Sequence, residues 1–168
     1  MSDDSGVFIE ALDFFPGVHS RRWTGSEKDD NLRNEKILEM MKDETDRDAY
    51  LISRFTLVNP AQEVLGNYVV KNKFTVALEE KGDAGFGYDR ILQPSKEMLD
   101  NYMKRCPAFS RDSFVYAEWS DLANRIEDEN LVIAELSQDE KNAICNRGRI
   151  AEQVKETLDY YCVSEVDL

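Results

Sequence analysis

Two long strand-like runs separated by a short polar turn constrain the fold of this chain more than any other feature. Residues 50–58 and 64–78 are rich in β-branched and aromatic side chains, which favour strands. The segment Asn59-Pro60-Ala61-Gln62 lies between them, and Asn and Pro are typical turn residues. The pattern predicts a hairpin that leads into the glycine-rich segment GDAGFGYD (82–89).

Helical patterns flank this hairpin on both sides. Residues 30–42 are expected to form an amphipathic helix, and residues 92–134 are predicted to be mainly helical and solvent-facing. Ser137 and Glu140 fit a capping box that begins a further helix, followed by a last one. The apolar positions that support these helices are Ile37, Leu38, Met41, Met98, Leu99, Tyr102, Met103, Val115, Trp119, Leu122, Ile126, Ile150, Val154, Leu158 and Tyr161. Helices packed on a hairpin-containing sheet indicate an α/β or α+β class.

The composition is that of a globular protein with one core. The chain has 168 residues, of which 42% are hydrophobic, so we expect a single domain over 1–168 that buries roughly two thirds of its unfolded surface. No apolar run approaches the ~18 residues of a membrane span, and no signal-peptide pattern opens the chain. Three cysteines without CxxC spacing and one histidine indicate neither a zinc site nor a disulfide framework. We therefore expect a reduced, cytoplasmic protein.

The net charge of −13 excludes one class of partner and leaves another open. Nucleic-acid binding depends on Lys and Arg that neutralise phosphates, so an acidic chain argues against it. A small phosphorylated ligand is compatible with this charge, because Mg²⁺ between carboxylates and a triphosphate can reverse the local sign of the field. For most of the acidic residues, solubility is a sufficient explanation.

Several short motifs have both a structural and a chemical interpretation when each is taken singly. Asp3-Asp4, followed by Ser5-Gly6, is typical of a solvated turn but also of a metal or phosphate site. Lys141 and Arg147 fit an ordinary charged helix face as well as an anion site. Phe86 in its glycine-rich loop could fill the core or stack on a base.

The order and spacing of five blocks resolve this ambiguity. DDSG, PGVHSRRWTG, DDNLRNEKILEMM, GFGYD and ELSQDEKNAICNRGR follow one another along the chain. This series resembles the non-standard purine nucleoside triphosphate pyrophosphatases, the inosine triphosphatase (ITPase-like) family, which carries DDSG, PGxxSxR[WY]xG, D…N…LL, GFGYD and ELxxxEKNxISHRG. The matching blocks cover most of residues 2–91 and 135–155.

The resemblance implies a reaction and a set of residues for it. The implied activity is Mg²⁺-dependent hydrolysis of ITP, dITP or XTP to the monophosphate and pyrophosphate. It makes Asp4 the proton acceptor and a metal ligand, with Asp3 supporting the metal and Ser5 touching substrate. Carboxylates suit Mg²⁺, a hard cation that takes oxygen ligands.

The resemblance also implies a purine pocket. Phe86 would stack on the base, the glycines around it, including Gly87, would let the backbone approach, and Tyr88 and Asp89 would shape the pocket. Lys141 would meet phosphate or ribose oxygens, and Asn146 with Arg147 would face the 6-position of the base. These two residues, as donors, would select a 6-keto oxygen over the amino group of adenine.

The chain departs from the family pattern in four places. Asn146 stands where the family has His, which predicts weaker discrimination between ITP and ATP. Arg90 replaces a proline, and residues 92–134 lengthen one connection as a helical insertion. The family's [ST]GNxxK phosphate loop, which precedes DDSG, is not found. We therefore expect a mixed, twisted β-sheet flanked by helices and N-terminally incomplete.

Two functional hypotheses follow from these matches and departures. The first is an active pyrophosphatase, alone, as a homodimer or with a complementing N-terminal segment. The second is a catalytically impaired nucleotide-binding or interaction subunit whose added helices dock a partner. The retained Asp4, Phe86, Asp89, Lys141 and Arg147 favour the first, whereas the missing loop and Asn146 favour the second.

Overall fold

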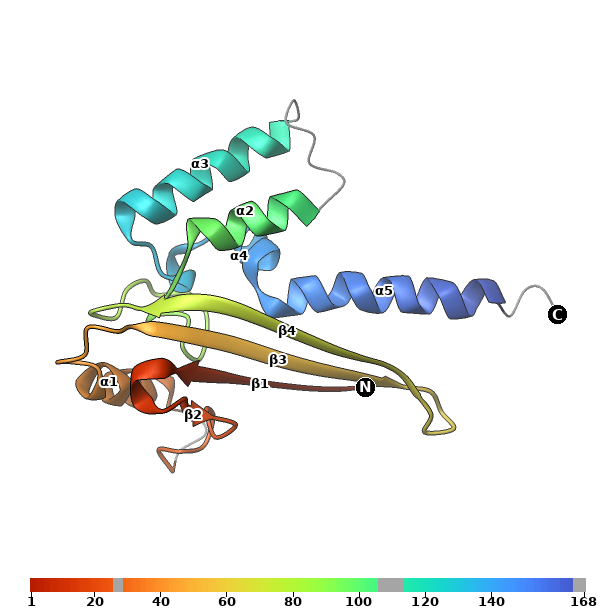
Figure 1. Ribbon diagram of the computed structural model, residues 1–168, viewed down its shortest axis with the longest axis horizontal. Helices are drawn as coiled ribbons and strands as arrows, with labels where there is room; N and C mark the ends of the chain where they lie inside the picture. Colours follow the sequence, from red (N-terminus) through yellow and green to blue (C-terminus); the bar gives the residue numbers. More distant parts are fainter. Residues whose placement is uncertain (26–28, 106–113, 165–168) are drawn as a thin grey trace.

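The predicted hairpin is confirmed and forms the centre of the sheet. The computed structural model describes residues 1–25, 29–105 and 114–164. Strand β3 (Asp48–Val58) pairs antiparallel with β4 (Val64–Val76). Their turn is closed by Asn59, whose Oδ1 accepts the Glu63 N–H at 3.0 Å. The two strands are the longest among the described residues and run along the whole length of the sheet (Figure 1).

Three shorter strands complete a five-stranded sheet of order β2-β1-β3-β4-β5. Strand β1 (Ser2–Ile9) pairs with β3 along its whole length, but with β2 (Phe15–Gly17) only through residues 7–9. Strand β5 (Leu92–Pro94) pairs with the end of β4. The expected α/β class, a sheet flanked by helices, is confirmed. All the described pairings are antiparallel, so the sheet differs from the mixed one that we expected in strand direction only.

The sheet has two chemically different faces, because successive side chains of a strand point to opposite sides. The register places these residues on one face, called the inner face here: Asp3, Ser5, Val7, Ile9, Ala49, Leu51, Ser53, Val70, Asn72, Phe74 and Val76. Apart from Asp3 and Ser5, which are exposed, they are buried or half-buried. The opposite, outer face carries Asp4, Arg54, Lys71 and Lys73, all exposed.

Helix α1 (Asp30–Met40) packs at the β1 side of the sheet, as Figure 1 shows. Its Ile37, together with Met41 just after it, joins the inner-face residues Ile9 and Phe74 in the main core. This helix begins where predicted and is closed at its start by Asp29, whose Oδ1 accepts the Leu32 N–H at 2.9 Å. Arg33 and Asn34 are also buried on it, a polar burial that hydrophobic periodicity did not indicate.

The prediction for residues 92–134 is confirmed for its helices and wrong for its exposure. Helices α2 (Lys96–Arg105) and α3 (Phe114–Glu129) occupy most of the segment, but β5 occupies its start. Leu99, Leu122 and Ile126 are buried in a second core that includes Ile144. The segment is amphipathic rather than solvent-facing, because its apolar stripe needs a partner surface.

Two further helices lie with α2 and α3 at the β4 side of the sheet (Figure 1). Helix α4 (Gln138–Ile144) starts with the predicted capping box, in which Ser137 and Glu140 exchange hydrogen bonds of 2.7 and 3.3 Å. Helix α5 (Asn146–Ser164) follows, and its Ile150 is buried. The side chains of Tyr102, Met103, Val115 and Tyr161, predicted above as apolar positions, lie outside the described residues. None of the helices in the described residues is long and apolar enough to cross a membrane.

Candidate functional site

Three segments that are far apart in the sequence meet at the start of α5. Arg147 Nε donates to Asp3 Oδ2 of β1 at 2.9 Å. The guanidinium carbon of the same arginine lies 5.5 Å from the ring centroid of Phe86. Lys141 of α4 pairs with Asp89 across 3.9 Å. These five residues are called the Arg147 cluster below. The family resemblance implied each of them as a site residue, and the structure brings the five together.

The loop of residues 85–89 holds the Phe86 ring out in solvent. Asp89 Oδ2 accepts the Phe86 N–H at 3.2 Å, and the Asp89 N–H donates back to the Phe86 carbonyl at 3.3 Å. Phe86 is 65% exposed, so it does not fill the core, and its ring is open to a stacking partner. Gly85 has φ +91°, and a Cβ there would overlap Asp89 Oδ2 and lie 3.0 Å from Lys141 Nζ. Only glycine fits this turn.

Asp89 and Lys141 form a largely buried ion pair. Their side chains are 20% and 12% exposed. Burial raises the pKa of Asp89, because it disfavours the charged form, while the Phe86 N–H and the Lys141 ammonium lower it by a smaller amount. The charged form of Asp89 is therefore less stable in the folded protein than in water.

This pKa shift predicts a pH dependence of stability. An acid whose pKa is higher in the folded than in the unfolded state binds more protons when folded, so stability rises on acidification. Relative to Asp89→Asn, the free energy of unfolding of the wild type should increase as the pH falls through the folded pKa of Asp89. The increase should end near the ordinary value of 3.8. Urea denaturation of both proteins across this range measures the difference, and a constant difference would contradict the prediction.

Tyr88 takes part in the site through its buried hydroxyl rather than by facing a ligand. The hydroxyl donates to the Ser20 carbonyl at 2.6 Å and accepts from Trp23 Nε1 at 2.9 Å. Burial raises the pKa of Tyr88 to about 12. The residue thus joins the 85–89 loop to the loop of residues 14–25, which carries the block PGVHSRRWTG. Its predicted influence on pocket shape is indirect in this arrangement.

Asn146 occupies a different position from the one expected. It is 1% exposed, and its Nδ2 lies 2.8 Å from the Leu51 carbonyl, 3.0 Å from Ser53 Oγ and 3.0 Å from the Val70 carbonyl. The amide ties the start of α5 to both central strands. The expectation that it faces the base does not match this geometry, because its donors are occupied by acceptors of the sheet.

The DDSG block lies inside β1, and alternation along the strand separates its two acids. Asp3 and Ser5 share the inner face, where Ser5 Oγ donates to Ser53 Oγ at 2.8 Å and lies 3.4 Å from Asp3 Oδ1. Asp4 lies on the outer face, beside Arg54 in the register, and is exposed. The structure therefore does not bring Asp4 into the Arg147 cluster.

The expected magnesium ligands can be tested against this geometry. Two carboxylates on opposite faces of one strand cannot bind the same ion together, and Asp3 is already paired with Arg147. Asp4 alone fits, because Mg²⁺ in nucleotide-processing sites is commonly held by one or two carboxylates plus substrate phosphates. The residues present are thus compatible with a metal held by Asp4 and a triphosphate.

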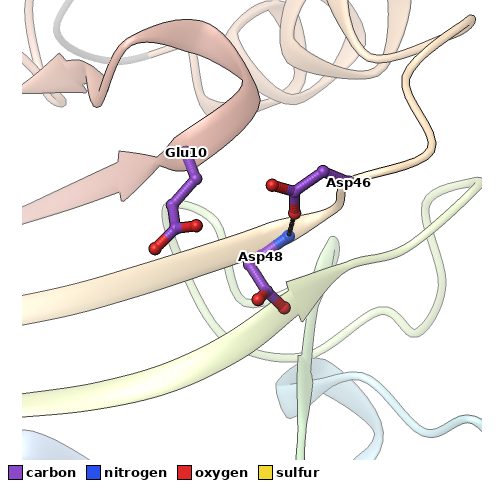
Figure 2. Close-up of side chains that lie close together, drawn as sticks. All are labelled: Glu10, Asp46 and Asp48. Carbon is purple, nitrogen blue, oxygen red and sulfur yellow. Dashed lines mark hydrogen bonds between the residues drawn. The ribbon is translucent and has the colours of Figure 1, made fainter.

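A different acidic group was not predicted from the sequence. Glu10, Asp46 and Asp48 place carboxylate oxygens within 4.8 Å of one another (Figure 2), and such a group could hold a metal ion. One oxygen of each carboxylate already has a partner, however, and that of Asp46 accepts the Asp48 N–H at 2.9 Å. The Tyr50 hydroxyl donates to Glu10 at 2.6 Å, and Lys73 pairs with Asp48 at 2.5 Å. The group lies near the Ile9–Ala49 pairing of β1 and β3, at the far end of these strands from Asp3.

Comparisons with known proteins give a consistent result. Residues 1–106 match the Ham1 family. The chain is 30% identical over 167 residues to a dITP/XTP pyrophosphatase of Corynebacterium jeikeium, covering 94% of this chain and 66% of that protein. It is 45% identical over 94 residues to a dITP/XTP pyrophosphatase of Methanosarcina mazei, covering 55% and 47% respectively.

Solved structures show the same relationship. The Ham1 protein of Staphylococcus aureus superposes with a TM-score of 0.68 at 24% identity, covering 95% of this chain and 66% of that one. At this identity the likeness concerns the fold. A HAM1 protein from Coxiella burnetii gives a TM-score of 0.66 at 28% identity with the same coverage. The chain spans about half to two thirds of the length of the curated relatives named above.

Proposed function

The chain belongs to the Ham1 family, and from this premise we propose that it provides the nucleotide site of a Mg²⁺-dependent pyrophosphatase. The substrates would be non-standard purine nucleoside triphosphates such as ITP, dITP and XTP, cleaved to the monophosphate and pyrophosphate. One observation carries the proposal. An exposed aromatic ring, Phe86, lies beside the cationic Arg147, and Lys141 pairs with Asp89 of the same loop, which suits a flat base attached to an anionic chain.

In this proposal, different residues of the Arg147 cluster bind different parts of the nucleotide. The exposed face of Phe86 stacks on the purine. Arg147 has only donors, of which Nε–H is bonded to Asp3, so its guanidinium favours a 6-keto acceptor over an amino group. Lys141 exchanges Asp89 for a phosphate or ribose oxygen when the nucleotide enters.

Asp4 is the residue that acts on the attacking water in this proposal. Asp3 already accepts a hydrogen bond from Arg147, whereas Asp4 is exposed at the next position of β1, on the outer face. A carboxylate of this kind accepts the proton of water at its oxygen. Mg²⁺, when bound by Asp4 and the phosphates, neutralises charge that develops on the triphosphate.

The edge of β1 supports the part of the proposal that concerns a complementing segment. Strand β1 pairs with β3 through residues 2–9 but with β2 only through 7–9. Within the described residues, the outer edge of residues 2–6 therefore has no strand beside it. An open edge of this kind readily accepts another strand. A segment with the family's [ST]GNxxK loop would add the phosphate grip next to Asp4.

In this proposal, helices α2 and α3, within residues 92–134, hold α4 in position. Arg125 of α3 pairs with Glu140 of α4 at 2.9 Å, and the second core packs α2, α3 and α4 together. These contacts hold the helix that carries Lys141. We propose that the segment is an insertion within a single domain.

The free thiol of Cys145 is compatible with a reducing, cytoplasmic location.

Pyrophosphate release tests the proposed function. We expect Mg²⁺-dependent release from ITP and XTP when the chain is supplied with a segment carrying the [ST]GNxxK loop, and much slower release by residues 1–168 without it. Gel filtration of both samples would report whether the chain forms a homodimer or self-associates through its open edge. Binding of ITP without turnover in either sample would favour the alternative, a nucleotide-binding subunit. Absence of both binding and turnover would overturn the proposal.

A further inference from the structure

The backbone of Gly87 is held on both sides by side chains of α1. Its N–H donates to Asp30 Oδ2 at 2.7 Å, and its carbonyl accepts from Asn34 Nδ2 at 3.1 Å. Asp30 and Asn34 are four residues apart, so they share one face of the helix. We propose that these two residues are positioning residues that fix the exposed Phe86 ring for base stacking, an inference that rests on the function proposed above.

Each arm of this Gly87 clamp is itself held in place. Asp30 forms an ion pair with Arg33, which is 4% exposed at its side chain and donates to the Arg21 carbonyl at 2.9 Å. Asn34 is 0% exposed. Burial and its hydrogen bond restrict the rotamers of Asn34, whereas the Asp30 side chain, which is 39% exposed, is held through its ion pair with Arg33. The start of α1 thereby sets the position of the 85–89 loop.

The loop needs such a clamp because Phe86 cannot position itself. Its ring is mostly in solvent, so few packing contacts restrict it, and Gly85 and Gly87 on either side have φ +91° and +62°. Glycines permit many backbone conformations, which costs conformational entropy when a ligand must order them. Asp30 and Asn34 hold both polar groups of Gly87. The entropic cost of ordering the loop is therefore met on folding, and nucleotide binding does not incur it again.

The clamp also changes the role expected for Gly87. Its N–H is committed to Asp30 and its carbonyl to Asn34. The glycine therefore contributes its left-handed conformation and its attachment to α1, and recognition of the base falls to Phe86 and Arg147. The sequence contained a signal for this arrangement, the i, i+4 pair of polar residues in DDNLRNEKILEMM, which hydrophobic periodicity alone passes over.

The Asn34→Ala variant separates a positioning role from a structural one. Asn34 Oδ1 is buried without a hydrogen-bond partner among the described residues, so the truncation removes an unsatisfied acceptor together with the bond to Gly87. We expect a small change in stability. Affinity for ITP should fall roughly tenfold, comparable to a weakened base–aromatic contact, whereas affinity for inorganic tripolyphosphate, which has no base, should stay unchanged. Glu35→Ala, at an exposed position on the same helix, is the matched control.

Two further measurements make the test decisive. Amide hydrogen exchange at Gly87 should accelerate at least about tenfold in Asn34→Ala, because the loop loses one of its two anchors. In the Phe86→Ala background, Asn34→Ala should have little additional effect on ITP affinity, because the clamp acts through that ring.

The outcomes distinguish this inference from the proposed function. ITP binding that is unaffected by Asn34→Ala, or equal losses for ITP and tripolyphosphate, would overturn the clamp and leave the function intact. A wild type that does not bind ITP would overturn the function. In that case the Gly87 exchange rates still decide the clamp, and unchanged exchange in Asn34→Ala would remove it.

Discussion

The Asp4→Asn protein is expected to release pyrophosphate from ITP roughly 10²–10⁴-fold more slowly than the wild type, the range typical for loss of a general base. An amide does not accept the proton of the attacking water and binds Mg²⁺ more weakly than a carboxylate. The assay measures kcat at saturating Mg²⁺, with the complementing segment present. Because Asp4 is exposed on the outer face of β1, the substitution should leave the free energy of unfolding nearly unchanged.

Asp3→Asn is the matched comparison for this prediction. It removes the ion pair with Arg147, whose Nε lies 2.9 Å from Asp3 Oδ2, and an amide oxygen can still accept that hydrogen bond. We expect a smaller loss of activity, mainly through a higher KM, since Arg147 binds the base in the proposed function. The reverse ranking would show that the inner-face acid, which already belongs to the Arg147 cluster, is the base and that Asp4 is a bystander.

The second large effect is expected on stability, in the Asn146→Leu protein. Leucine has a similar size but no donors, so the acceptors at Leu51, Ser53 and Val70 lose the Nδ2 group. Unpaired buried polar groups cost about 1–3 kcal/mol each. The sheet carbonyls keep some of their other bonds, so we expect a loss of about 3 kcal/mol in the free energy of unfolding. Urea denaturation measures this loss.

Asn146→His is the companion variant, because the related family carries histidine in this block. The sequence alone predicted that the amide weakens discrimination between ITP and ATP. The buried position of Asn146 now makes stability the main expected effect, with the ratio of kcat/KM for the two nucleotides nearly unchanged. A strong rise of this ratio in Asn146→His would show that position 146 faces the base after all.

Local chemistry made several elements predictable. Asn59 and the flanking β-branched runs predicted the hairpin, and Ser137 with Glu140 predicted the start of α4, because each depends on residues within a few positions of one another. Asp3, Phe86 and Arg147 were each implied as site residues by the family resemblance, and the structure adds that they lie together. Neither composition nor periodicity carries information about contacts between residues so distant in the chain.

Local sequence patterns predicted the hairpin and the helical segments, and the family resemblance supplied the candidate residues of the Arg147 cluster. The faces on which Asp3 and Asp4 lie, and the hydrogen-bond partners of Asn146 and Asn34, depend on the tertiary structure. It separates Asp3 from Asp4, because β1 exposes alternate residues on opposite faces. It buries Asn146 against two strands, and it places Asn34 of α1 on the carbonyl of Gly87. The same physical reason explains the positions of Asn146 and Asn34. A buried amide takes whichever acceptors the packed elements bring to it, and those acceptors lie 76 or 95 positions away for Asn146 and 53 for Asn34.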